Sequence, residues 1–450
     1  MQVTDGLTGG ARLRAMFTLT LAVLLSVLGA SLPNIALPGI AEALRVTPSA
    51  SVWVVNAFQI VVTVSLLPFS SLGDIYGYRR VYGLGIVVFT LGSLLCGLAP
   101  DLPTLVAARM LQGIGSAGIM SVNTALVRMI FPRALLGRGM GVNTMVVATS
   151  MALGPTATAA ILALGDWHWL FLVNVPLGVV AIATLRFLPR SDRGAHRFDV
   201  PSAVLNATTL GLFIAGLDWF GHGTSVWAGI ALIAAAAGAG VVFVRRQMTL
   251  SAPMLPVDLF RRPAFSLAVA TSVFSYMGQT SAYVALPFLF HAGGASAIGT
   301  GLLMTPWPVA VMLVAPFAGG LADRFAAGLL GGVGLAAMTL GLLAIAGLSA
   351  DAAWWDVAWR MVLTGAGFAL FQTPNNRQLI MSVPRERSGA GSGMISTSRL
   401  LGQTMGAALV ALVFGAMQAQ GVGAAATTAV LMGAGLTAVA TVFSLARLRG

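Results

Sequence analysis

An aspartate and two arginines stand close together between two long apolar segments, within residues 66–82. Asp74 ends the first segment, and Gly77 supplies a tight turn after it. Arg79 and Arg80 then precede the second segment. Carboxylates and guanidinium groups at this spacing can form ion pairs, and charged side chains near helix ends interact favourably with the helix dipole. We therefore predict a polar latch at a membrane surface, in which Asp74 pairs with the two arginines.

A similar turn comes back 249 residues later, at Asp323-Arg324. A plain orientation signal for a membrane protein requires only basic residues on one side of the membrane. It requires neither an acid nor a repeat. The second turn therefore favours a mechanical role for both turns.

Three arginines lie within apolar segments, where a charge is costly and usually faces a wet cavity or a partner. Arg109 lies about six residues inside its segment, and Arg399 about ten residues inside another. Arg360 lies nearer the end of its segment, so snorkelling to the surface explains it equally well. Uncharged polar residues could line the same cavity or serve as contacts between helices. They are Asn34, Gln112, Asn143, Gln279, Tyr283, Gln372, Asn375 and Gln403.

No carboxylate and no histidine lies near the middle of any apolar segment. Enzymes that use metals or acid–base chemistry need such groups in clusters, and here they are scattered. The chain has no lysine and therefore no Gly-x4-Gly-Lys phosphate loop, which excludes ATP-driven transport within it. Its single cysteine, Cys96, excludes a disulfide framework. We expect neither enzymatic activity nor a cofactor or metal ion.

The composition requires a membrane protein, because 57% of the 450 residues are hydrophobic and only 8% are charged. We predict an all-α fold with fourteen transmembrane helices. They run near 15–41, 51–72, 82–99, 104–127, 139–164, 169–188, 200–220, 225–245, 264–288, 298–321, 328–348, 354–374, 389–415 and 424–446. The net charge of +12 does not indicate nucleic acid, since the arginines occupy the short links between apolar segments. There they orient the chain and contact lipid headgroups.

The arginines also predict the orientation. If the links alternate from a cytoplasmic N-terminus, Arg45 is the only link arginine on the outer side. So uneven a distribution favours an even number of helices, with both termini in the cytoplasm. Arg12 and Arg14 precede the first apolar segment, as in a secretory signal. Its length and the many segments after it favour an uncleaved first helix.

The two halves of the chain resemble each other at a nearly constant spacing. Asp323 follows Asp74 by 249 positions, Arg360 follows Arg109 by 251, and the segment at 396–403 follows the one at 148–155 by 248. This indicates a duplicated bundle, and transporters built from such repeats bind substrate at the repeat interface. We predict two pseudo-symmetric six-helix bundles with two inserted helices between them. The three parts are residues 1–190, 191–262 and 263–450.

Several motifs resemble those of one known family. Leu105-x3-Arg109-x2-Gln112-Gly113 is similar to the helix 4 motif of the major facilitator superfamily, and Leu153-Gly154-Pro155 to the helix 5 motif of its antiporters. The segments 34–38, 167–178 and 372–376 resemble helices 1, 6 and 10 of its 14-helix drug/proton antiporter family. The chain is identified as a member of that multidrug efflux type.

The resemblance implies that two halves rock about a central cavity while the aspartate turns hold the cytoplasmic side shut. The implied cytoplasmic gate comprises Asp74, Gly77, Arg79, Arg80, Asp323 and Arg324. The helix 4 motif implies Arg109, Gln112 and Gly113 as coupling and cavity residues, and the depth of Arg399 in its segment adds that residue to the set. Gly154 and Pro155 would form the antiporter kink that keeps the cavity closed to leakage. An ordinary packing kink at these two positions is an open alternative.

The chain departs from the family at three places. Gly29 stands where helix 1 of the family carries an aspartate, and Ile75 and Tyr78 stand where its latch has basic residues. Thr158-Ala159 replaces the trailing glycines of the helix 5 motif. Proton coupling, which the resemblance implies, would then need a site shared with Arg109, a peripheral acid such as Asp74, or the substrate itself.

We therefore expect a monomeric secondary transporter in the bacterial inner membrane, surrounded by lipid and without a nucleic-acid partner. It would export hydrophobic or amphipathic small molecules, and the resemblance adds protons as the coupling ion. Arg109 and Arg399 favour neutral or anionic substrates over lipophilic cations. An importer or uniporter of a specific metabolite on the same fold is the alternative.

Overall fold

The computed structural model describes residues 6–46, 48–51, 53–191, 198–222, 226–250, 253–295, 297–349 and 352–448. Within these ranges the chain forms α-helices and short 3₁₀ turns, and no strand. Helices begin close to each predicted start. The largest difference at an end is in the helix predicted over 354–374, which continues to Met381 although Pro374 lies inside it. Packed neighbours let a membrane helix continue through a proline that would end it in water.

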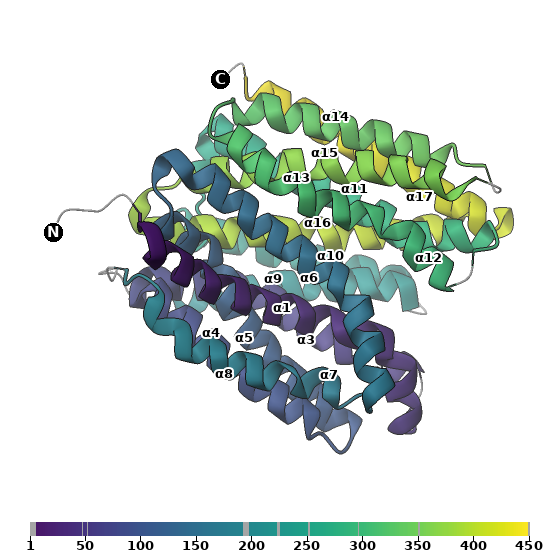
Figure 1. The fold of residues 1–450 in the computed structure, drawn as a ribbon, viewed down its shortest axis with the longest axis horizontal. Helices are drawn as coiled ribbons and strands as arrows, with labels where there is room; N and C mark the ends of the chain where they lie inside the picture. Colours follow the sequence, from purple (N-terminus) through teal and green to yellow (C-terminus); the bar gives the residue numbers. More distant parts are fainter. Residues whose placement is uncertain are drawn as a thin grey trace.

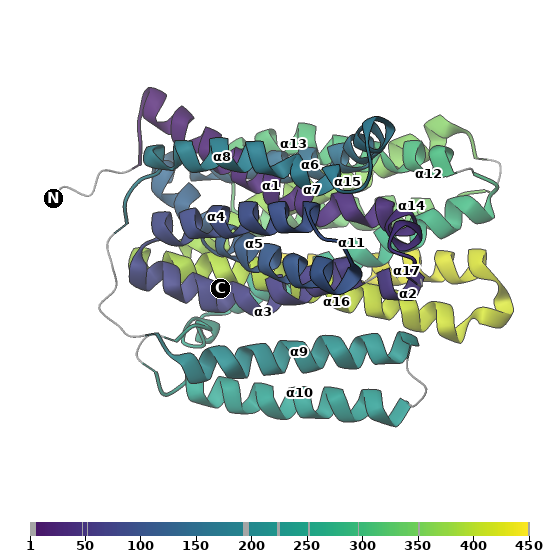
Figure 2. The same cartoon turned by 90° about the horizontal axis from the view of Figure 1, so that it is seen from below.

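The helices fall into two groups that lie side by side, with a helical hairpin on one flank (Figures 1 and 2). The first group is α1 (Gly9–Ala43), α2 (Pro48–Ser51), α3 (Trp53–Tyr76), α4 (Tyr78–Gly97), α5 (Leu102–Ile130), α6 (Leu136–Leu164), α7 (Trp169–Leu172) and α8 (Asn174–Thr184). The hairpin is α9 (Val200–His222) and α10 (Val226–Gln247). The second group is α11 (Pro263–Ala292), α12 (Ala297–Met304), α13 (Pro306–Ala322), α14 (Ala327–Ala346), α15 (Trp354–Met381), α16 (Ser388–Ala416) and α17 (Val422–Ala446). The 3₁₀ turns are Arg133–Leu135, Leu185–Phe187, Leu259–Arg261, Arg385–Arg387 and Gln418–Gln420.

The outer surface of the helices is apolar. Leu164 is 92% exposed, Trp227 78% and Phe317 73%, and many other large hydrophobic side chains are also uncovered. A water-soluble protein does not leave so much apolar surface open. In the described residues, ten helices are long and apolar enough to cross a membrane. The molecule is therefore an integral, multi-pass membrane protein.

Local chemistry sets where the helices begin and turn. Gly77 has φ +97°, a left-handed conformation that favours glycine, and it lets the chain reverse between α3 and α4. Asp101 caps α5 by accepting a hydrogen bond from the Thr104 N–H at 2.9 Å. This bond holds the pKa of the Asp101 carboxyl below its ordinary value. Each device lies where one apolar segment ends and the next begins.

Helices cross most closely where glycines meet. A Cβ on Gly85 of α4 would lie 2.9 Å from backbone atoms of Gly115 and Gly118 in α5. A Cβ on Gly334 of α14 would lie 2.6 Å from the carbonyl oxygen of Gly367 in α15. Gly334 and Gly367 follow Gly85 and Gly118 by 249 positions each. The same crossing is therefore present in both groups of helices.

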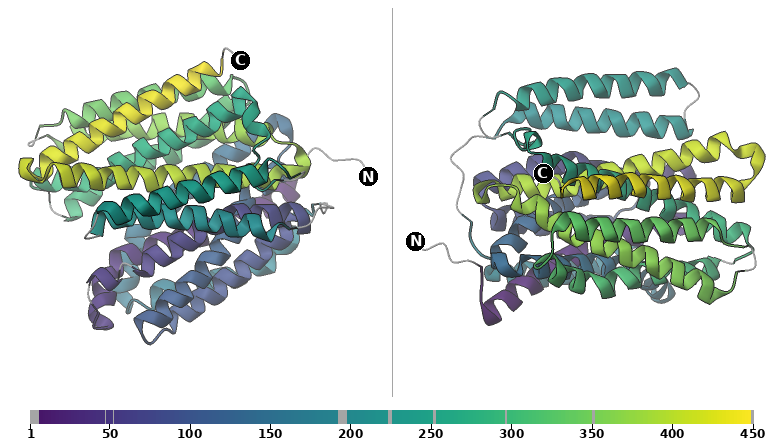
Figure 3. Two further views of the ribbon diagram at one scale, coloured as in Figure 1. Left: turned by 180° about the vertical axis from the view of Figure 1, so that it is seen from behind. Right: turned by 90° about the horizontal axis from the view of Figure 1, so that it is seen from above.

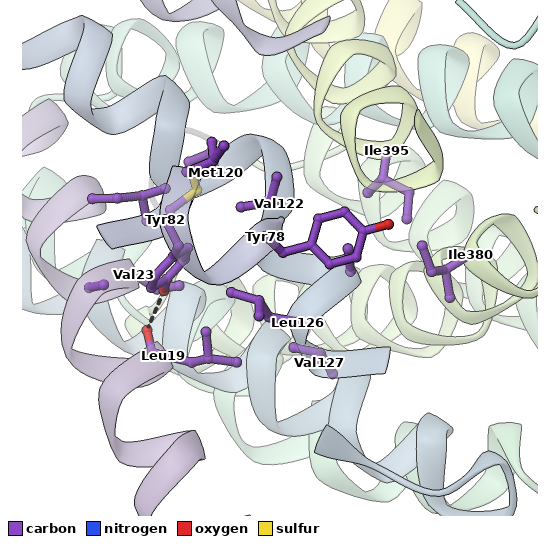
Figure 4. Close-up of a cluster of buried hydrophobic side chains, with 14 of the residues drawn as sticks. Leu19, Val23, Tyr78, Tyr82, Met120, Val122, Leu126, Val127, Ile380 and Ile395 are labelled. Carbon is purple, nitrogen blue, oxygen red and sulfur yellow. Dashed lines mark hydrogen bonds between the residues drawn. The ribbon is translucent and has the colours of Figure 1, made fainter. Parts of the chain in front are cut away.

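Buried side chains join the two groups. One hydrophobic cluster combines residues of α1 and α3–α6 with residues of α15 and α16. In Figure 4 the Tyr78 ring of this cluster points its hydroxyl toward Ile380 and Ile395 of the second group. Tyr82, one helical turn further along α4, instead donates to the Leu19 carbonyl of α1 at 3.3 Å. The interface between the groups is thus a packed core.

The hairpin lies against α3 and α16, one helix from each group (Figure 3). Asn206 of α9 is buried and donates to the Val64 carbonyl of α3 at 2.8 Å. Pro68, four residues after Val64, has no N–H to bond that carbonyl, so Asn206 satisfies a group that the proline leaves free. Arg246 of α10 pairs with Asp199 at 2.7 Å and holds the pKa of that carboxyl below its usual range. Asn206 therefore ties the hairpin to α3, while the ion pair joins the two helices of the hairpin to each other.

Candidate functional site

Asp74, at the end of α3, binds the first turn of α16. Its side chain is buried, and its carboxylate accepts hydrogen bonds from the Gly389 N–H at 2.8 Å and the Ala390 N–H at 3.1 Å. The Tyr78 hydroxyl donates to it at 2.7 Å. The first N–H groups of a helix have no partner within that helix, and the helix dipole favours an anion there. Asp74 therefore caps a helix of the other group.

Glycine is required where these helices meet. A Cβ on Gly389 would lie 2.5 Å from both the Asp74 Oδ1 and the Ser70 carbonyl oxygen. A Cβ on Gly393, one turn later, would lie 2.5 Å from the Ser70 hydroxyl. We call this contact between α3 and α16 the Asp74 seam.

Asp323 makes the equivalent contact on the other side of the molecule, at the end of α13. Its Oδ1 accepts from the Gly137 N–H at 2.8 Å and its Oδ2 from the Arg138 N–H at 3.2 Å, both in the first turn of α6. A Cβ on Gly137 would lie 2.4 Å from the Gly319 carbonyl oxygen. We call this contact between α13 and α6 the Asp323 seam. The two aspartates thus cap two helices, each in the opposite group.

The predicted ion pairs of the latch are wrong. In the described part of the chain no ion pair joins Asp74 to Arg79 or Arg80. Arg79 donates to the Leu188 carbonyl at 3.3 Å, and Arg80 is exposed. The turn at Gly77 brings Tyr78, and not the two arginines, to the Asp74 carboxylate. Asp323 likewise has Arg377 as its cationic partner, at 3.2 Å, while its neighbour Arg324 is exposed.

Sequence reasoning missed two arginines at the seams. Arg128, near the end of α5, donates to the Val383 carbonyl at 2.9 Å and to the Ser388 hydroxyl at 2.8 Å. It therefore binds the start of α16 from the other side of the Asp74 seam. Arg377 follows Arg128 by 249 positions, the spacing of the two aspartates. That spacing was the signal that could have identified both.

Arg109 is fully buried inside the first group. It donates to the Val54 carbonyl at 2.8 Å, to the Gly29 carbonyl at 2.9 Å, and to Gln112. Its guanidinium lies 4.2 Å from the centre of the Phe58 ring, a favourable cation–π distance. No carboxylate of the described residues pairs with it, so neutral groups alone hold this charge.

Gly29 and Gly113 explain how Arg109 is enclosed. A Cβ on Gly29 would lie 2.5 Å from the Phe89 ring, so Phe89 fills the space that a longer side chain would need. A Cβ on Gly113 would lie 2.9 Å from the Phe58 carbonyl oxygen, which requires glycine where α5 meets α3. Gln112 connects Arg109 to Ser93 through a hydrogen bond of 2.7 Å. The predicted coupling residues Arg109, Gln112 and Gly113 therefore form one buried cluster.

Arg399 lies elsewhere, in a small polar cavity of about 30 Å³ between the two groups. Five helices line it: α5, α6, α11, α15 and α16. Two of the predicted lining residues, Asn143 and Gln372, are present there together with Asn123 and Tyr276. The cavity has room for a water molecule or two and no substrate-sized ligand, so the structure is closed at its centre.

The other predicted lining residues lie away from this cavity. Asn375 donates to the Ser272 hydroxyl at 2.8 Å and accepts from Arg447 at 2.7 Å, within the second group. Tyr283 packs edge-on against Trp307, and Gln279 and Gln403 are half-buried outside the cavity lining. The side chain of Asn34 lies outside the described residues.

Arg360, expected near the end of its helix, has an acidic partner on the same helix. Arg360 pairs with Asp356, four residues earlier, at 2.9 Å. It therefore pairs with an acid and does not enter the central cavity.

A Cβ on Gly154 would lie 2.8 Å from the Ser31 hydroxyl, which places the predicted kink at a close contact of α6 with α1. The side chain of Pro155 is outside the described residues.

The arrangement can hold the molecule shut at one end. Both seams lie at the end where α1 begins and α17 ends. Near the centre, the Ser392 hydroxyl accepts from the Thr124 N–H at 3.2 Å, and the Ser396 hydroxyl donates to the Met120 carbonyl at 3.3 Å. These hydrogen bonds also join the two groups, and all of them would have to break for this end to open. Among the described residues, no group of three or more histidine, cysteine or acidic side chains could hold a metal ion.

Comparison with known proteins places these features in a family. Residues 19–407 match the family described as Major Facilitator Superfamily. The chain is 51% identical over 413 residues to the uncharacterized transporter YebQ of Escherichia coli, covering 91% of this chain and 90% of YebQ. It is 30% identical to the riboflavin transporter RibZ of Clostridioides difficile, covering 89% and 87%. It is 33% identical to the multidrug resistance protein Stp of Mycobacterium tuberculosis, covering 86% and 73%.

A solved structure has the same fold. The proton:xylose symporter XylE superposes with a TM-score of 0.69 and 15% sequence identity, covering 96% of this chain and 94% of XylE. At this identity the likeness extends to the fold only.

Proposed function

The chain belongs to the Major Facilitator Superfamily, and we propose that it exports hydrophobic or amphipathic small molecules across the bacterial inner membrane. The family and the relatives are transporters, so the chain is a membrane transporter and not an enzyme. We propose the outward direction of transport, the class of substrate and the location in the bacterial inner membrane. The multidrug resistance protein Stp, which the chain matches over most of its length, supports the class of cargo.

We further propose fourteen membrane crossings in three parts. Residues 1–190 and 263–450 each form a six-helix bundle, and residues 191–262 supply the two inserted helices. The glycine crossings at Gly85 and Gly334, 249 positions apart, support a duplication, as do the two aspartate caps. Both termini lie in the cytoplasm in this scheme, which follows from the arginine distribution.

Transport proceeds by rocking of the two bundles about the central cavity. This proposal rests on the two helix caps between the bundles, in which Asp74 binds the start of α16 and Asp323 binds the start of α6. Each cap joins opposite bundles, so breaking both frees the cytoplasmic end to open. Arg128 and Arg377 belong to the gate together with the predicted aspartates. Gly77 contributes by setting the turn that brings Tyr78 to Asp74.

The proton gradient is the proposed energy source. The enclosed environment of Arg109 reduces the number of candidate proton-binding sites. Arg109 has backbone carbonyls, the Gln112 amide and aromatic rings as neighbours, and none of these groups titrates near neutral pH. A shared proton site at Arg109 is therefore disfavoured. Asp74 or the substrate itself would then carry the proton.

The experiment is an accumulation assay in cells that express the chain, with cationic, neutral and anionic dyes, with and without a protonophore. Proton-driven export predicts lower accumulation that the protonophore abolishes. Lower accumulation that survives the protonophore contradicts proton coupling. No effect on any dye contradicts export of varied amphipathic molecules.

The riboflavin transporter RibZ supports a second candidate, an importer or uniporter of one metabolite on the same fold. Counterflow in membrane vesicles separates the two. Exchange of labelled substrate without a gradient, combined with no gradient-driven export, would favour this alternative.

A further inference from the structure

We propose that the central cavity binds organic anions when the two groups of helices separate and enlarge it, and that Arg399 is the residue that binds their acidic group. This inference rests on the proposed transport function and adds the charge class of its substrate. It starts from two arginines, Arg109 and Arg399, that lie well inside membrane helices. Arg109 is enclosed by protein, whereas Arg399 lines the cavity between the bundles.

Arg399 is unpaired. Within the described residues it has no carboxylate partner, no hydrogen bond and no aromatic ring beneath it, although it is partly buried among five helices. A charge away from bulk water is costly until a counter-ion and hydrogen bonds compensate it. The guanidinium fork matches a carboxylate, which it can bind through two parallel hydrogen bonds. A ligand with a carboxylate would therefore neutralise the charge of Arg399 in the cavity.

The other polar groups of the cavity are neutral and face the same space. Asn123 donates to Asn143 at 2.8 Å, and Gln372 donates to the Tyr276 hydroxyl at 2.6 Å. The carbonyl oxygen of the Asn123 side chain is buried without a partner, and the Asn376 side chain makes no hydrogen bond with the described residues either. These amides can bind hydroxyl, carbonyl or amine groups of a ligand. They carry no charge that could balance a cation.

No acidic side chain lines the described part of the cavity. A lipophilic cation that entered would therefore meet a like charge with no counter-ion, which is unfavourable at low dielectric. An anion of similar size and shape would gain an ion pair at the same place. The cavity thus discriminates by charge in favour of anions.

The test is equilibrium binding to the purified, full-length chain in detergent, followed by fluorescence polarisation. Two probes share one ring system: fluorescein is an anion near neutral pH and rhodamine 123 is a cation. The variants are Arg399→Gln, which removes the charge, and Arg399→Lys, which keeps the charge without the fork. Arg360→Gln is the matched control, since Arg360 pairs with Asp356 outside the cavity. Gel filtration confirms that each variant is folded.

We expect saturable fluorescein binding that Arg399→Gln weakens by about ten-fold or more. Arg399→Lys should lose less, Arg360→Gln should change nothing, and rhodamine 123 should bind Arg399→Gln at least as well as the unchanged protein. Absence of saturable fluorescein binding would overturn the inference. Equal binding of fluorescein to Arg399→Gln would overturn it as well.

Dye export in everted membrane vesicles separates this inference from the proposed function. Export of rhodamine 123 without fluorescein binding leaves the transport proposal standing and removes the anion site. The predicted binding pattern without export of either dye removes the export proposal and leaves the anion site.

Discussion

The Asp74 seam and the Asp323 seam use the same device with different partners. In each, an aspartate at the end of one helix caps the first turn of a helix in the other bundle. Asp74 accepts a further hydrogen bond from the Tyr78 hydroxyl, whereas Asp323 forms an ion pair with the Arg377 guanidinium. The hairpin α9–α10 lies beside the Asp74 seam, against α3 and α16. The helix cap is therefore the element that the two seams share, while the third partner of each aspartate differs.

The strongest way to break both seams is to add a side chain where the helices touch. Gly389→Val and Gly137→Val would each place a Cβ about 2.5 Å from a backbone oxygen of the facing helix. Overpacking of this kind costs about 3 kcal/mol. We expect both variants to open the gated end, measured as faster reaction of a cysteine introduced at the seam with a water-soluble maleimide.

Gly435→Val is the control for this clash, since a Cβ at Gly435 meets nothing within 4 Å. Equal maleimide reactivity of all three variants would contradict the expectation that the close contacts at Gly389 and Gly137 keep this end closed.

Removal of the aspartates should reveal the difference between the seams. Asp74→Ala leaves two buried N–H groups without a partner and removes the acceptor of Tyr78, at a cost of about 2–3 kcal/mol. Asp323→Ala should cost less, about 1–2 kcal/mol, because the Asp323 seam is nearer to solvent and Arg377 is partly exposed there. Thermal unfolding and the same maleimide assay measure both. A larger effect of Asp323→Ala would reverse the order that burial predicts.

Tyr78→Phe tests the partner that only the Asp74 seam has. Loss of the hydroxyl removes one hydrogen bond to a buried carboxylate, which we expect to weaken the seam by about 1 kcal/mol. Tyr82→Phe is the matched control on the same helix, because Tyr82 bonds the Leu19 carbonyl within its own bundle. Maleimide reactivity should rise in Tyr78→Phe alone. An equal rise in both would mean that the hydroxyl of Tyr78 has no special role.

The smallest effect is expected at the edge of the Asp74 seam, where Arg387 pairs with Asp258 at 2.8 Å. The hydrogen bond from Arg387 holds the pKa of Asp258 below its ordinary value. A lowered pKa means that the carboxylate stabilises the fold above its unfolded pKa, about 4, and loses this contribution as the pH falls. Asp258→Asn should therefore lower the unfolding temperature slightly near neutral pH. The difference from the unchanged protein should shrink at pH values below about 4, and a constant difference would contradict the assignment.

The sequence predicted the helices well because long apolar segments have few alternatives in a membrane. It also located both aspartates, since an acid at the end of an apolar segment is conspicuous and its spacing repeats. It did not predict their partners. The N–H groups of Gly389 and Gly137 have no side-chain signature, and only packing of the two bundles brings them to Asp74 and Asp323. Nearby arginines were the obvious partners in the sequence, and they were wrong.

The two arginines within helices show the same limit. Their depth in apolar segments was evident, but their surroundings were not. Arg109 is enclosed because Gly29 and Phe89 together leave no open space beside it, and this depends on how α1 meets α4. Arg399 reaches the cavity because α16 faces the interface between the bundles. Sequence position alone could not distinguish these two environments.

In the proposed mechanism the aspartate caps hold the two bundles together at the end that opens. Its most direct test is a spin-label distance across the Asp74 seam by pulsed double electron–electron resonance. Labels at Tyr76→Cys and Glu386→Cys, both exposed, are placed in a Cys96→Ala background. Ala134→Cys with Phe325→Cys reports the Asp323 seam in the same way. We expect a shift to longer distances across the Asp74 seam when Asp74→Ala is added, and an unchanged distance distribution would contradict the role of the cap.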